Sequence, residues 1–221
     1  MKTFLSIGSG PGIGIATAVR FAEEGFRIIL TSRDAAKLSE RVAQMKDEGF
    51  VVAAKAVDAG DLASVSALIK ETEAEFGAID VLHFNVASMH SATIETQKPD
   101  TFVPDLTVNI GAALVAVQDV SSGMLKRGEG SILLTGGIFG VAPHPDYLSL
   151  SIGKAGIRAL TLGTFEGFRE RGVHIATVTI GTLVSAGSSE SHEIAEAFWS
   201  LHAQPKDAWS AEVSYPASTS V

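Results

Sequence analysis

The chain has 221 residues, 46% of them hydrophobic, which is enough to bury a central sheet with helices on both faces. Seventeen lysines and arginines against 25 aspartates and glutamates give a net charge of −8, which opposes binding to nucleic acid or an anionic membrane. Without cysteine the chain forms no disulfide and no thiolate metal site. The N-terminus enters a short apolar strand, and no apolar run approaches the roughly 20 residues of a membrane helix. We expect one soluble, cytoplasmic domain over residues 1–221.

A glycine-rich turn over residues 8–14 separates the apolar run 4–7 from a helical pattern over residues 15–21. In a strand, glycine turn and helix taken in that order, the first N–H groups of the helix face an anion. Glycine also lets the backbone approach a diphosphate closely. This turn predicts a dinucleotide site, although any tight turn from strand to helix can use such glycines.

Short apolar segments then alternate with amphipathic helical patterns along the chain. Gly25, Gly49 and Gly77 each follow a helical pattern and precede the next strand. Six strands are predicted near residues 3–7, 27–32, 51–57, 79–84, 131–135 and 173–180, with a weaker seventh around 212–215. This alternation predicts an α/β fold, a doubly wound, mostly parallel sheet of six or seven strands with helices on both faces.

Two helical segments have more apolar or small residues than packing on a sheet requires. Residues 106–117 are apolar nearly all round, and Ala159, Gly163 and Gly167 form a small-residue ridge at four-residue spacing. These features predict a partner surface and a homodimer or homotetramer. The alternative is that both faces pack inside the monomer.

The end of the second strand indicates which dinucleotide would bind. An NAD site normally has an Asp or Glu there to accept hydrogen bonds from the ribose, whereas this chain has Ser32 and then Arg33. A guanidinium suits a 2′-phosphate. NADP(H) is therefore favoured over NAD(H), unless Arg33 is only a solvated residue at a strand end.

The chain resembles the short-chain dehydrogenase/reductase family over nearly its whole length. The resemblance implies a single Rossmann-type domain, a dinucleotide cofactor and a small-molecule substrate that the sequence does not name. The matching positions are the motif glycines Gly8, Gly12 and Gly14, then Asp58 after the third strand, Asn109 on the long helix, Lys154 of the Tyr-x-x-x-Lys motif and Gly181 after the sixth strand.

Two positions depart from the family pattern where its catalytic Ser and Tyr would stand. These positions are Gly137 and Leu150, and neither side chain can donate a proton or a hydrogen bond. Tyr147, seven residues before Lys154, is the candidate replacement acid, and the alternative is a loop aromatic. The segment 184–189 is also too short to form an extended substrate lid.

Two functions remain open: an NADP(H)-dependent oxidoreductase with an atypical active site, and a cofactor-binding protein without turnover that acts as a sensor or assembly subunit. The scattered histidines predict no metal site. The predicted catalytic residues are Asn109, Lys154 and Tyr147. The predicted cofactor-binding residues are Gly8, Ser9, Gly12, Ile13, Gly14, Ser32, Arg33, Asp58, Asn85, Lys154 and Gly181.

Overall fold

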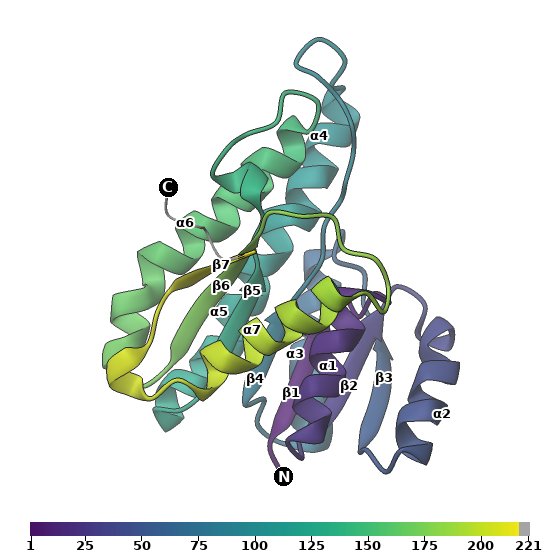
Figure 1. Cartoon of the computed structure of the whole chain (residues 1–221), viewed down its shortest axis with the longest axis vertical. Coiled ribbons are helices and arrows are strands. Elements are labelled where there is room, and N and C mark those ends of the chain that lie inside the picture. Colours follow the sequence, from purple (N-terminus) through teal and green to yellow (C-terminus); the bar gives the residue numbers. More distant parts are fainter. Residues whose placement is uncertain (217–221) are drawn as a thin grey trace.

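The computed structural model describes residues 1–216, so residues 217–221 of the predicted domain lie outside the described part. Seven strands form one sheet in the order β3-β2-β1-β4-β5-β6-β7, and every neighbouring pair is parallel (Figure 1). The strands are β1 (Thr3–Ile7), β2 (Arg27–Ser32), β3 (Val52–Ala56), β4 (Val81–Phe84), β5 (Ser131–Thr135), β6 (His174–Ile180) and β7 (Glu212–Tyr215). The six predicted strands and the weaker seventh are confirmed, and the sheet is entirely parallel.

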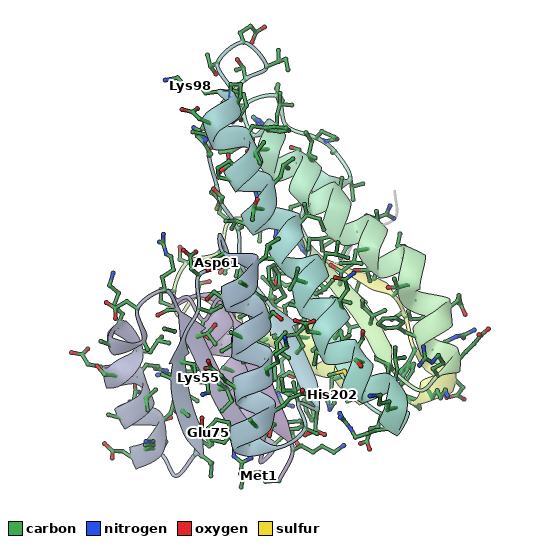
Figure 2. The ribbon with its side chains drawn as sticks, turned by 180° about the vertical axis from the view of Figure 1, so that it is seen from behind. Met1, Lys55, Asp61, Glu75, Lys98 and His202 are labelled. Atoms are coloured by element: carbon green, nitrogen blue, oxygen red, sulfur yellow. The ribbon has the colours of Figure 1, made fainter. Side chains whose placement is uncertain are left out.

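Seven α-helices cover the sheet: α1 (Ile13–Glu23), α2 (Ser39–Asp47), α3 (Leu62–Phe76), α4 (Pro99–Leu106), α5 (Ala112–Arg127), α6 (Leu148–Glu170) and α7 (Ser189–Ala203). Side chains from α1, α2 and α7 pack in the core on one face, and those from α3, α5 and α6 pack on the other. Figures 1 and 2 show the two layers from opposite sides. Because both faces are covered, the central strands β1, β4, β5 and β6 are buried along their whole length.

Local capping explains where several of these elements begin. Asp61 is the N-cap of α3, and its carboxylate accepts a hydrogen bond from the Ala63 N–H at 2.9 Å. Asp34 accepts from the Ala36 N–H at 3.0 Å, but the turn that it caps is a 3₁₀ turn over Ala35–Leu38. The helix predicted directly after Asp34 therefore starts one turn later, as α2.

The long helical run of residues 99–127 corrects one expectation from the sequence. Its 29 residues are long and apolar enough to cross a membrane, by length and composition alone. In this fold the run packs against α3 and α6, and its buried apolar residues belong to the core. It begins at Pro99, a favoured first helical position, and it also accommodates Pro104 in its interior.

The small-residue ridge of α6 lies on the surface. Ala159 is exposed, and a Cβ added at Gly163 or Gly167 would meet no atom within 4 Å. Leu114 on α5 and Leu162 on α6 are exposed as well. The alternative that the ridge packs inside the monomer is wrong for the described chain.

The order of the strands determines where a ligand can bind. Strands β2 and β3 lie on one side of β1, and β4 to β7 lie on the other. The crossover helices on the two sides of this division lie on opposite faces, which leaves a crevice at the carboxyl ends of β1 and β4. The glycine turn after β1 and the segment after β4 meet in that crevice.

Candidate cofactor and active site

The glycine turn is shaped for close backbone approach. Gly8 has φ +94°, and a Cβ there would lie 2.6 Å from the Asn85 carbonyl oxygen. A Cβ at Gly14 would lie 2.5 Å from the Gly8 carbonyl oxygen. Gly12 is the N-cap of α1 and supplies no side-chain cap, so the first turn of the helix keeps N–H groups free for an anion. The turn therefore fits a diphosphate.

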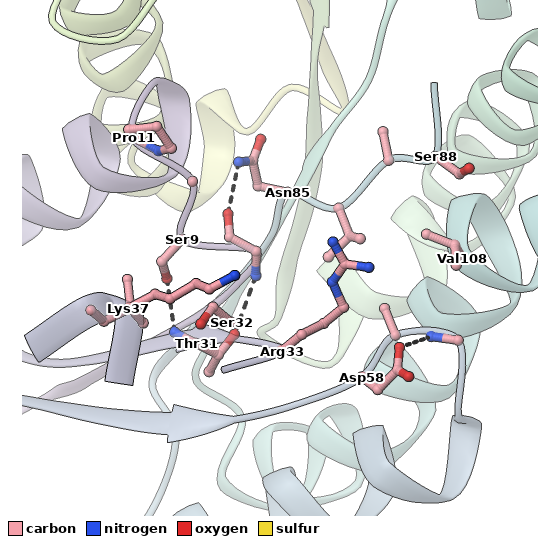
Figure 3. Close-up of a pocket in the computed structure, with 17 residues that line it drawn as sticks. Ser9, Pro11, Thr31, Ser32, Arg33, Lys37, Asp58, Asn85, Ser88 and Val108 are labelled. Atoms are coloured by element: carbon pink, nitrogen blue, oxygen red, sulfur yellow. Dashed lines mark hydrogen bonds between the residues drawn. The ribbon is translucent and has the colours of Figure 1, made fainter. Parts of the chain in front are cut away.

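Hydrogen bonds to neighbouring strands hold this turn in place (Figure 3). The Thr31 N–H donates to Ser9 Oγ at 2.9 Å, and the Ser9 N–H donates to the Thr31 carbonyl at 2.9 Å. Asn85 Nδ2 donates to the Gly8 carbonyl at 2.9 Å from the end of β4. Ser9 and Asn85, both predicted to bind cofactor, thus also fix the turn that would hold it.

A first cavity of about 630 Å³ opens in front of the turn. Its wall includes Ser32, Arg33 and Asp58, and the Asp58 carboxylate accepts a hydrogen bond from the Gly60 N–H at 2.8 Å. Lys37 also lines this cavity, from the 3₁₀ turn after β2. In Figure 3 the cationic side chains of Arg33 and Lys37 both extend into the space between Ser9 and Asp58. The cavity therefore has two cations for an anionic ligand.

Lys37 is a residue that the sequence reasoning missed. Pro11, just before the second motif glycine Gly12, carries no charge. The available signal was Lys37 itself, four residues after Arg33 and beyond the capping residue Asp34. Lys37 reaches the cavity from the 3₁₀ turn Ala35–Leu38, whose geometry sets the direction of its side chain.

A second cavity of about 440 Å³ shares Asn85 and Ala87 with the first. Most of its wall is apolar and comes from the ends of β5 and β6, the start of α6 and the segments after β4 and β6. It brings together six positions singled out in the sequence, namely Ile13, Asn85, Gly137, Leu150, Lys154 and Gly181. Leu183, which is 89% exposed, forms part of its rim. Only residues 184–188 separate this rim from α7, in agreement with the prediction of a short lid.

Lys154 is the ionisable group of the second cavity. Its Nζ donates a hydrogen bond to the Thr135 carbonyl at 2.7 Å. A Cβ added at Gly137 would lie 3.4 Å from Lys154 Cγ, so the lysine stem runs alongside that glycine. Burial lowers the pKa of Lys154 to about 8, although the residue keeps some accessible surface in the open cavity.

Asn109 holds the segment after β4 instead of lining either cavity. It is 1% exposed and lies in a single π-helical turn, Thr107–Gly111, between α4 and α5. Its Oδ1 accepts from the Ser88 N–H at 2.6 Å, and its Nδ2 donates to the Ser88 carbonyl at 3.1 Å. Such π-helical turns are frequent at functional sites. Asn109 thus positions the segment that connects the two cavities.

Tyr147 is not brought into either cavity. It precedes α6, and its ring stacks on Phe139 with centroids 5.7 Å apart and meets the edge of His144 at 5.4 Å. Ser151 accepts a hydrogen bond from the His144 N–H at 3.1 Å, and Ser149 donates to Asp105 at 2.9 Å. The hydroxyl groups of Ser149 and Ser151 therefore form hydrogen bonds outside the second cavity.

Among residues 1–216 no group of three or more His, Asp or Glu side chains is arranged to bind a metal. The site therefore consists of the glycine turn, a cationic first cavity and an apolar second cavity that meet at the end of β4.

Comparison with known proteins shows which family has this architecture. The sequence model of the short chain dehydrogenase family matches residues 2–195. The chain belongs to the short-chain dehydrogenase family. An uncharacterized oxidoreductase of Staphylococcus saprophyticus is 27% identical over 181 residues, which span 81% of this chain and 77% of the relative.

Two solved structures extend the likeness to three dimensions. A short-chain dehydrogenase from Rhodopseudomonas palustris has a TM-score of 0.89 and 26% identity, over 96% of this chain and 97% of that one. A gluconate 5-dehydrogenase from Burkholderia cenocepacia, solved in complex with NADP and tartrate, has a TM-score of 0.76 and 29% identity, over 81% of this chain and 71% of that one. The chain therefore has oxidoreductase relatives, and solved neighbours of its fold bind NADP.

Proposed function

We propose that this short-chain dehydrogenase is an NADP(H)-dependent oxidoreductase with an atypical active site. The observation that supports the proposal is that the two cavities are adjacent and share Asn85 and Ala87 in their walls. The first presents cations beside a glycine turn, and the second presents Lys154 in an apolar wall. A dinucleotide has a charged end and a reactive end that match these two halves.

Each half has residues suited to one part of NADP(H). The free N–H groups at the start of α1 would hold the diphosphate, and Asp58 would lie against the adenosine end. Arg33 and Lys37 would bind the 2′-phosphate, which NAD(H) lacks. Ile13 and Gly181 would flank the nicotinamide end in the second cavity. When bound, the cofactor supplies or accepts a hydride.

The proposed substrate is a small, largely apolar molecule with a carbonyl group or an activated double bond. Apolar side chains dominate the second cavity, and its described wall contains no charged residue other than Lys154. Because Gly137 and Leu150 replace a hydroxyl and a phenol, ordinary carbonyl reduction is expected to be slow. The loss of a general acid typically costs about 10²–10⁴ in rate.

The alternative function is NADP(H) binding without turnover, as a sensor or assembly subunit. Gly137 and Leu150 support it because neither can polarise or protonate a substrate. The exposed rim at Leu183 also supports it, since an open site excludes water poorly.

We further propose a homodimer or homotetramer in the cytoplasm, without nucleic-acid or membrane partners. The exposed apolar residues of α5 and α6 support self-association, and the net charge of −8 disfavours polyanionic partners.

Calorimetric titration with NADPH and NADH, followed by turnover measurements, tests the proposal. We expect tighter binding of NADPH, and NADPH oxidation above background with some member of a panel of apolar aldehydes, ketones, quinones and enones. NADPH binding without turnover across the panel would favour the sensor or assembly function. Failure of NADPH to bind at physiological concentration would contradict both functions.

A further inference from the structure

Reduction in the second cavity needs a proton as well as a hydride, and few side chains there can give one. The polar side chains in its described wall are Asn85, Thr135, Lys154 and Thr182. Asn85 is an amide whose Oδ1 accepts from the Thr135 hydroxyl at 2.9 Å and whose Nδ2 donates to Gly8. The threonine hydroxyls are very weak acids at neutral pH. Lys154 is the one titratable group in this wall.

We propose that Lys154 is itself the proton donor of the reaction. This inference rests on the proposed oxidoreductase function and gives Lys154 a direct role in place of the missing tyrosine. The substrate oxygen, which gains an electron pair as the neighbouring carbon accepts hydride from NADPH, takes a proton from the Lys154 ammonium. An N–H bond breaks, an O–H bond forms, and the neutral amine regains its proton from water. NADPH is oxidised and the substrate is reduced.

The geometry leaves the ammonium available for this step. One N–H of Lys154 is fixed by the Thr135 carbonyl at 2.7 Å, so two N–H bonds remain for ligands. Gly137 places no side chain beside the lysine stem, and Leu150, one helical turn before Lys154, adds an apolar wall. The two substitutions that remove the usual acid thus also leave the lysine uncovered toward the cavity.

The surroundings of Lys154 contain no charged group that would hold its proton. The end of β5, the turn Ile138–Gly140, the end of β4 and the π-helical turn present only neutral side chains toward it. His83 lies behind Thr135, and burial lowers its pKa to about 3, so it stays neutral. Asp105 is held by Ser88 at 2.5 Å, His90 at 3.2 Å and Ser149 at 2.9 Å. No carboxylate within the described chain forms an ion pair with Lys154.

Desolvation therefore acts on Lys154 without a compensating anion. It lowers the pKa to about 8, close to the pH at which a cytoplasmic enzyme works. A general acid is most effective when its pKa lies near the operating pH, because the protonated form is populated and the proton is also readily released. An ordinary lysine, with a pKa near 10.4, would release it less readily.

Direct titration of the amine tests the inference without any turnover. In cofactor-free protein labelled with ¹³C at lysine Cε, the NMR signal absent from Lys154→Arg should titrate with a midpoint near pH 8. Lys70→Arg, at an exposed lysine, should leave this signal unchanged and serves as the control. A Lys154 midpoint above pH 10 would overturn the proposal.

Turnover measurements provide the second arm. Lys154→Arg keeps the positive charge but cannot release a proton, so kcat should fall by about 10²–10⁴ while the NADPH Kd stays within about threefold. Lys70→Arg should leave both unchanged. The kcat of the unmodified protein should decline above pH 8, as the ammonium loses its proton.

Three results would contradict the role of Lys154. Full turnover in Lys154→Arg would show that the reaction needs only the positive charge of Lys154 and not its proton. Loss of turnover in Tyr147→Phe would show that Tyr147 is the acid. NADPH binding without turnover of any substrate would leave no reaction for Lys154 to assist. Absence of NADPH binding would remove the proposed function itself, whereas the NMR midpoint would still report the acidity of Lys154.

Discussion

Arg33 and Lys37 approach the first cavity from one short segment, yet they were not equally visible in the sequence. Arg33 directly follows β2, at the position whose charge distinguishes NAD sites from NADP sites. Lys37 is separated from it by Asp34 and the start of a 3₁₀ turn, and its direction depends on the geometry of that turn. Both are exposed, so neither is required for core packing.

Arg33→Ala and Lys37→Ala should each weaken NADPH binding and leave NADH binding nearly unchanged. A hydrogen bond to a charged group contributes about 1.5–3 kcal/mol, so a loss of about 10- to 100-fold is expected for the stronger partner. Calorimetry with both cofactors measures the difference, with exposed Lys46→Ala on α2 as control. Equal losses for NADPH and NADH would show that the cations do not contact the 2′-phosphate.

Gly137 and Leu150 are positions where the usual catalytic groups can be restored. A Cβ at Gly137 would make ordinary contacts of 3.4–3.7 Å with the Lys154 stem, so a serine fits there. Leu150 already lines the second cavity. The double variant Gly137→Ser, Leu150→Tyr should raise ketone reduction by about 10²-fold or more, because it adds a hydrogen-bond donor and a phenolic acid.

The matched control for this restoration is Gly137→Ala, Leu150→Phe, which adds similar volume without hydroxyl groups. It should show no gain in steady-state NADPH oxidation. If the Ser and Tyr variant folds, binds NADPH and still shows no gain, then the second cavity does not present a carbonyl to these positions.

Two glycines of the β1-turn-α1 unit differ in how closely other atoms approach them. At Gly14 an added methyl group would meet the Gly8 carbonyl at 2.5 Å and Ser9 Cα at 2.8 Å, both of them backbone atoms. At Gly10 it would meet no atom within 4 Å. Gly14 therefore allows the helix to pack against the turn, while Gly10 borders open space.

Gly14→Ala should lower the melting temperature and Gly10→Ala should not. Forced overpacking typically costs about 1–3 kcal/mol, which corresponds to several degrees in a chain of this size. Thermal unfolding followed by circular dichroism compares the two variants without cofactor. A similar melting temperature for both would mean that the turn relaxes to accept the methyl group.

The paired helices α5 and α6 present an apolar surface that the monomer leaves uncovered. We name this surface the α5–α6 face and define it by Leu114, Leu162, Gly163 and Gly167. Leu162→Glu should shift the protein toward monomer in sedimentation experiments, because a charge would be buried in the proposed contact. Val51→Glu, at another exposed apolar site, is the control. An unchanged mass for Leu162→Glu would exclude this face as the contact.

Buried neutral histidines make the stability of the whole molecule depend on pH. Burial lowers the pKa of His83 to about 3 and of His202 to about 4, and it lowers the pKa of His174 as well. The unfolded chain, with ordinary histidine pKa values near 6.5, takes up protons first as the pH falls. Their stabilising contribution is therefore complete above about pH 6.5 and decreases as the pH falls toward the folded values.

Urea unfolding at several pH values should show this decrease. Each neutral buried histidine contributes a slope of up to about 1.4 kcal/mol per pH unit below its unfolded pKa. His83→Gln should remove one such contribution and flatten the profile between pH 6 and pH 4, whereas exposed His192→Gln should not. If His83→Gln left the pH dependence of the unfolding free energy unchanged, the lowered pKa of His83 would be contradicted.

The sequence by itself determined the fold and much of the cofactor half of the site. Apolar strands alternating with amphipathic helices admit few arrangements other than a doubly wound parallel sheet, because parallel strands require crossovers and both faces must be covered. The glycine turn and Arg33 were visible because such features act through adjacent residues. A long helix ending near residue 126 was expected, but its start at Pro99 and its membrane-length apolar run were not, because Pro99 and Pro104 left the start of the helix open.

The tertiary structure decided what the remaining candidates can do. It placed Lys37 in the first cavity, turned Asn109 toward Ser88 and left Tyr147 stacked outside the second cavity. It also placed Lys154 against Gly137 and Thr135 in a desolvated wall. A residue's acidity and reach depend on groups that are distant in sequence and adjacent in space, and spacing along the chain does not contain that information.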